Sequence, residues 1–125
     1  METQSLWPEF EVEKEKSPKT ILREQAGYLA EKTNNVLSAD IQTTLDQYGK
    51  MVHHFFIVAP ALDNYRYLIL HVVHDVIYYP LEVLTGNYMH RAQDQEGFLK
   101  ILSNVFNDAE TKRVISSLLS QSLAE

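Results

Sequence analysis

The pattern of hydrophobic and polar positions changes its period twice along the chain. Between residues 17 and 37, apolar side chains recur at steps of three and four, as on one buried helix face. Between residues 39 and 84, alternation and continuous apolar runs predict strands, and beyond residue 94 the helical period returns. The pattern predicts an α+β fold with an N-terminal helix, an antiparallel sheet of about four strands, and a C-terminal αα-hairpin packed on the sheet.

The predicted helices have clear starting signals. Ser17 can accept the free N–H groups of the first turn, and Pro18 then occupies the first helical position, where its missing N–H costs nothing. A second helix is expected to start at Asp94. Asp108 is expected to interrupt the helical run and to cap a last helix that continues to about Leu123.

The extended part divides into strands at residues that favour turns. Gly49 supplies a positive φ for a hairpin, and Pro80 requires an edge strand or a bulge where it falls inside an apolar run. The short connections allow only antiparallel pairing. The four predicted strands, and a fifth that the pattern leaves open, cover residues 39–48, 51–58, 65–73, 76–84 and 87–93.

The strands are apolar on both faces. The first choices for buried sheet positions are Phe55, Ile57, Leu68, Leu70 and Val72. Helices on one face would leave the other exposed, so a second cover is needed from other helices, from the N-terminal segment or from another subunit. A homodimer is therefore expected.

The sequence pattern predicts two parts: a polar N-terminal arm over residues 1–16 and a single α+β domain over residues 17–125. The arm carries Trp7 and Phe10, which can pack onto the domain's own surface or dock on a partner subunit. Exposure of a tryptophan side chain to water is unfavourable, and either arrangement would bury the side chain.

Composition excludes several classes of function. The net charge of −6 comes from 11 basic and 17 acidic residues, and nucleic-acid binding requires a cationic surface. Cysteine is absent, so disulfides and thiolate metal sites are excluded. The N-terminus lacks the features of a secretory signal, and no apolar stretch is long enough to span a membrane. A cytoplasmic protein without a cofactor is expected.

Four of the five histidines lie between residues 53 and 74. Tight hairpins would place His53, His71 and Tyr78 in one cross-strand row. Imidazoles at that spacing can bind a metal, here through His53 and His71, and a His–Tyr pair with Asp75 nearby can transfer protons. The chain has no metalloprotease, phosphate-loop or nucleophile-elbow motif, so this cluster is the only candidate for catalysis.

Tyrosines are also concentrated in the predicted sheet. A sheet face that carries tyrosine, arginine and histidine is typical of protein-recognition surfaces, because rigid aromatic rings bury area at little entropic cost. Some of these tyrosines can instead lie between sheet and helices with their hydroxyls at the rim. The candidate binding residues are Trp7, Tyr65, Arg66, Tyr67, Tyr78 and Tyr79.

Together these features favour a small acidic cytoplasmic protein-interaction module that binds another protein through a tyrosine-rich sheet face. An inhibitor, an immunity or antitoxin-like binder, and a subunit of a larger assembly all fit the size, the acidity and the missing catalytic motifs. The alternative is a small metal- or ligand-binding enzyme that uses the His/Tyr cluster on the sheet.

Overall fold

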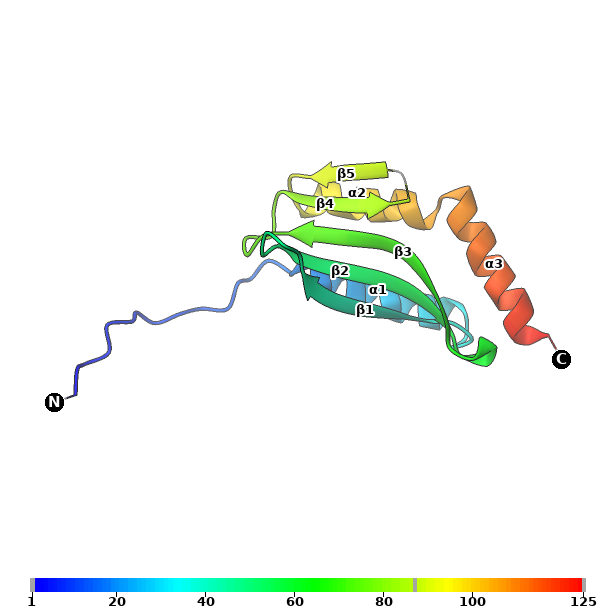
Figure 1. Ribbon diagram of the computed structural model, residues 1–125, viewed down its shortest axis with the longest axis horizontal. Helices are drawn as coiled ribbons and strands as arrows, with labels where there is room; N and C mark the ends of the chain where they lie inside the picture. The colour runs from blue at the N-terminus through cyan, green and yellow to red at the C-terminus, as the bar shows by residue number, and fades with distance from the viewer. Residues whose placement is uncertain (1, 87, 125) are drawn as a thin grey trace.

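An antiparallel sheet carries helices on one of its two faces (Figure 1). The structure is a computed structural model that describes residues 2–86 and 88–124. Within these residues the sheet has five strands in the order β1-β2-β3-β4-β5, so each strand pairs with its neighbour in sequence. The elements are α1 (Pro18–Lys32), β1 (Ser38–Leu45), β2 (Met51–Ala59), the 3-10 turn η1 (Pro60–Leu62), β3 (Tyr65–His74), β4 (Leu81–Thr85), β5 (Tyr88–Ala92), α2 (Gln95–Phe106) and α3 (Ala109–Leu123).

The helix starts lie where the sequence predicts them. Ser17 Oγ accepts a hydrogen bond from the Thr20 N–H at 3.1 Å, and Pro18 opens α1. Asp94 caps α2 and Asp108 caps α3 through their carboxylates. Each cap satisfies an N–H group that has no partner within its helix, so these residues determine where the helices begin.

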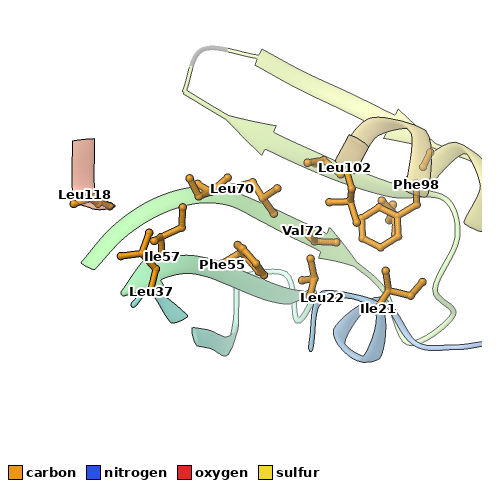
Figure 2. Packing of buried hydrophobic residues seen from close by; sticks show 14 of the residues in the cluster. Ile21, Leu22, Leu37, Phe55, Ile57, Leu70, Val72, Phe98, Leu102 and Leu118 are labelled. Atoms are coloured by element: carbon orange, nitrogen blue, oxygen red, sulfur yellow. The ribbon is translucent and has the colours of Figure 1, made fainter. Parts of the chain in front are cut away.

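The core lies between the helices and one face of the sheet (Figure 2). Phe98 and Leu102 of α2 and Ile21 and Leu22 of α1 point toward this face, and all four are buried. Four of the five predicted core positions of the sheet are confirmed as buried: Phe55, Ile57, Leu70 and Val72. The helical layer thus covers the alternate residues of β2 and β3 that the hydrophobic pattern selects.

The prediction for Leu68 is wrong, because its side chain is 39% exposed on the opposite face. Phe55 pairs with Leu70, but Phe56 pairs with Leu68, which makes Ile69 an extra residue in β3. An extra residue reverses the alternation of side chains beyond it. The bulge therefore places Ile69 and Leu70 in the core and turns Leu68 away from it.

The predicted strand over residues 76–84 is too long at its start. β4 begins at Leu81, and Val76 and Ile77 lie in the preceding connection, each 76% exposed. Pro80 has no N–H to donate to a sheet ladder, and the strand starts directly after it. The fifth strand that the pattern leaves open is confirmed as β5, and Asn87 at its predicted start lies outside the described residues.

Candidate functional site

Among the described residues, no helix covers the face of the sheet that is turned away from α1 and α2 (Figure 1). We call it the open face. It is formed by the alternate residues of each strand that do not enter the core, and its apolar side chains come from β2 to β5. Its members are Ser38, Asp40, Gln42, Thr44, Val52, His54, Phe56, Val58, Arg66, Leu68, His71, Val73, Glu82, Leu84, Met89 and Arg91.

A pair of histidines lies near the middle of the open face. His54 and His71 are cross-strand partners on β2 and β3, and their Nδ1 atoms are 2.8 Å apart. His54 Nε2 also contacts Thr44 Oγ1 at 2.9 Å. Partial burial, and then the nearby His54 ring, lower the pKa of His71 below its ordinary value. The pair is therefore a polar contact that lies beside the apolar side chains of Val52, Phe56 and Val73 on the open face.

Arg66 is held on the open face by two contacts. Its Nη2 donates to Asp40 Oδ2 at 2.7 Å, and its guanidinium carbon lies 4.3 Å from the centre of the Phe56 ring. The ion pair is solvent-exposed and contributes little to stability. Its effect is to orient a cation over an aromatic ring, which is a common feature of protein-recognition surfaces.

A second histidine pair lies on the opposite, core-facing side of the same strands. His53 Nε2 and His74 Nε2 are 2.8 Å apart, and the two residues are only 2% and 4% exposed. His74 Nδ1 is 2.6 Å from the Asp75 carbonyl oxygen, so His74 Nδ1 donates and its Nε2 accepts from His53. His53 Nδ1 then accepts from the Thr43 hydroxyl at 2.9 Å. Every donor and acceptor in this chain is satisfied when both rings are neutral.

The buried pair strongly disfavours a charge on His53. Burial, and then the charges of His74, Lys19 and His54 in decreasing order, together lower the pKa of His53 to about 4. A second proton on the ring would also remove the acceptor that Thr43 uses. His53 is thus a neutral structural histidine at physiological pH.

The predicted row of His53, His71 and Tyr78 is not formed. His53 pairs with Val72, while His71 pairs with His54 and lies on the other face. The predicted pairing of residue 59 with residue 65 is correct, but the bulge at Ile69 shifts the register by one residue before His53 is reached. The second predicted hairpin, with residue 73 opposite 76, is also wrong because Val73 pairs with Glu82.

The residues proposed for catalysis are accordingly separated. Tyr78 belongs to the connection between β3 and β4, where its ring lies 5.8 Å from that of His74 on the core side. Asp75 accepts from His74 through its backbone carbonyl, and its side chain is exposed. Within residues 2–86 and 88–124, no three histidine or carboxylate side chains converge as a metal site. Metal binding by His53 or His71 stays an untested prediction.

The tyrosines do not share one face of the sheet. Tyr65 and Tyr67 line a cavity of about 900 Å³ beside α3, together with Lys112 and Arg113. Tyr79 lies in the connection before β4, where burial, and then the charges of Glu15 and Asp94, raise its pKa to about 12. Its hydroxyl is buried without a hydrogen-bond partner among the described residues.

Of the predicted binding residues, Arg66 alone lies on the open face. Trp7 is 79% exposed in the arm, 6.1 Å from the ring of Phe10. Sequence reasoning missed the specific members of the open face, above all Phe56, Leu68 and His54. The sequence signal for this surface was that both faces of the strands are apolar. That signal does not show which residue lies on which face.

Comparisons of the chain with protein-family models, with curated proteins and with solved structures each found no match. Among the described residues, none of the helices combines the length and the apolar composition needed to cross a membrane.

Proposed function

We propose that this chain is a small protein-interaction module whose open face binds a second copy of the chain. One observation carries the proposal: apolar side chains extend across four adjacent strands on a face that no described helix covers. Leu68 and Met89 are 39% and 61% exposed there, and Val52, Phe56, Val73 and Leu84 are half-buried. Contiguous exposed apolar surface is characteristic of protein interfaces.

The charges on the open face favour a second copy as the partner. The whole chain has a net charge of −6, so two copies repel each other over most of their surfaces. The open face is different, because its two acidic residues, Asp40 and Glu82, are balanced by Arg66 and Arg91. Two such faces can approach without net repulsion, and packed sheets bury both of them about 10 Å apart.

A two-fold dimer of this kind fits the functions expected of a small non-catalytic binder. Face-to-face packing would leave the helical layers of both copies on the outside, available for a further partner. An inhibitor, an immunity or antitoxin-like binder and a subunit of an assembly are all compatible with such a paired arrangement. The surface of contact in this dimer is the open face and not the predicted tyrosine-rich face.

Replacing Leu68 with aspartate tests the proposal. The position is exposed and next to Arg66, so the monomer should tolerate the carboxylate. At a face-to-face interface the substitution would bury two charges, which weakens association by about 100-fold or more. Sedimentation velocity should show a species of twice the chain mass of 14.4 kDa for the wild type and a monomer for Leu68→Asp at the same concentration.

The matched control is Tyr48→Asp, which adds the same charge at an exposed position in the β1–β2 turn, outside the open face. It should sediment as the wild type does. A wild-type monomer over the whole micromolar range, or equal dissociation of both variants, would contradict the proposal.

A further inference from the structure

A second apolar surface lies on the helical side of the sheet. A cavity of about 600 Å³ opens between α1, α2 and α3, and Phe55, Ile57 and Ile69 form its floor. We call it the helix groove. Lys32 is the one charged side chain among the described residues that line it. The size and apolar lining suit a small number of large hydrophobic side chains, with a preference for an acidic segment beside the lysine.

The N-terminal arm has this composition. The exposed fractions of Leu6, Trp7, Phe10 and Val12 are 94%, 79%, 72% and 92%. Between residues 2 and 16 there are five glutamates and two lysines, so this segment has a net charge of −3. In the structure the arm extends away from the domain (Figure 1). Four exposed apolar side chains in one short segment are unfavourable in water, and burying them in an apolar cavity is favourable.

The base of the arm lies on the side of α1 that leads to the helix groove. Lys16 Nζ forms an ion pair with Glu24 Oε2 at 2.8 Å. Tyr28 lies one turn beyond Glu24 on the same side of the helix, and Tyr28 lines the groove. The arm therefore starts out beside the helix face that borders the cavity.

The groove is within reach of the arm of the same chain. Ser17 lies seven positions after Phe10, and a chain of that length spans up to about 24 Å when extended. The first turn of α1 is only about 15 Å from Tyr28, at 1.5 Å per helical residue. A short tether gives an effective concentration on the order of millimolar, which exceeds that of a second copy in a micromolar solution. The tether thus favours the chain's own arm as the occupant.

We propose that the arm docks in the helix groove of its own chain, with Trp7 and Phe10 inserted between the helices and the glutamates beside Lys32. The structure then shows the open form of a module that also has a closed form. Any other acidic, apolar segment that binds the groove must first displace the arm. This inference goes beyond the proposed dimer, since the groove and the open face are on opposite sides of the sheet.

The test uses the fluorescence of Trp7, the single tryptophan of the chain. In the full-length protein its emission should lie at shorter wavelength, with acrylamide quenching reduced severalfold, compared with a synthetic peptide of residues 1–16. Leu99→Glu places a carboxylate at an exposed position of the groove and should restore the emission and quenching of the free peptide. Leu123→Glu, at an exposed position of α3 that does not line the groove, should leave them unchanged.

Three results would overturn the inference. The first is a wild-type Trp7 that is as quenchable as the peptide. The second is a blue shift that appears only as the protein concentration rises, because this would place the arm in a second copy. The third is a blue shift that survives Leu99→Glu. The signal should be the same in Leu68→Asp, which separates this test from that of the dimer.

Discussion

Acidification from pH 7 to pH 4 is expected to remove about 3 kcal/mol of folding free energy through His53 alone, because its pKa falls from an ordinary 6.5 to about 4 in the folded protein. Below pH 6.5 the unfolded chain gains a proton on this ring, whereas the folded protein excludes it. The stability is therefore present above pH 6.5 and is lost as the pH falls toward 4. The cause is the buried chain from Thr43 through His53 to His74, which is fully hydrogen-bonded only with neutral rings.

The measurement is urea unfolding of the wild type and of His53→Leu at pH 7 and pH 4. The variant should be less stable at pH 7, because it loses two hydrogen bonds, yet should lose about 3 kcal/mol less than the wild type on acidification. His90→Leu, which removes an exposed histidine of β5, is the matched control and should keep the wild-type pH dependence. Equal acid losses in all three proteins would refute the role of His53.

Truncation of Phe98 to alanine is expected to destabilise the domain by about 3–5 kcal/mol. Phe98 is fully buried in the first turn of α2 and contributes to the core together with α1 and the middle strands (Figure 2). Removing the ring would leave a cavity between α1, α2 and the sheet, which close-packed neighbours fill only in part. Thermal or urea unfolding measures the loss.

Lys100→Ala provides the control for this truncation. It lies two residues further along the helix, and its side chain is exposed and does not line the helix groove, so the change should cost less than about 1 kcal/mol. A loss at Phe98 no larger than that at Lys100 would mean that α2 does not pack on the sheet as described.

The helices and most of the sheet could be predicted because their signals are local. Ser17, Asp94 and Asp108 have side chains that cap the helices within three residues, and Gly49 takes up the positive φ of 78° that its turn requires. The first choices for buried positions in β2, Phe55 and Ile57, are confirmed. None of these features depends on contacts between distant parts of the chain.

The errors arose where one residue changed the alignment of everything beyond it. The bulge at Ile69 leaves no mark in a run of apolar residues, yet it exposes Leu68 and separates His53 from His71. The apolar pair Val76 and Ile77 has the composition of a strand but lies in an exposed connection. Hydrophobic composition indicates that a segment tends to form a strand. The register depends instead on how that strand pairs with its neighbours in the sheet.

From the sequence, the candidate site could be predicted only as an excess of apolar sheet residues, without the identity of its members. The sequence shows more apolar sheet residues than one helical layer can cover, and the structure locates that surplus on the open face. Which histidines and aromatic residues belong to it depends on the register, so the metal-binding row and the tyrosine-rich face could not be tested from the sequence. Arg66 was selected as a tyrosine neighbour, and it lies on the open face because the bulge comes after it in β3.

Cross-linking through a single introduced cysteine tests the central claim most directly, because the chain has no cysteine of its own. We expect Leu68→Cys, on the open face, to give a covalent dimer with a short bismaleimide in dilute solution. Leu123→Cys, exposed at the end of α3, should stay monomeric under the same conditions. No dimer from Leu68→Cys, or equal cross-linking of both variants, would contradict association through the open face.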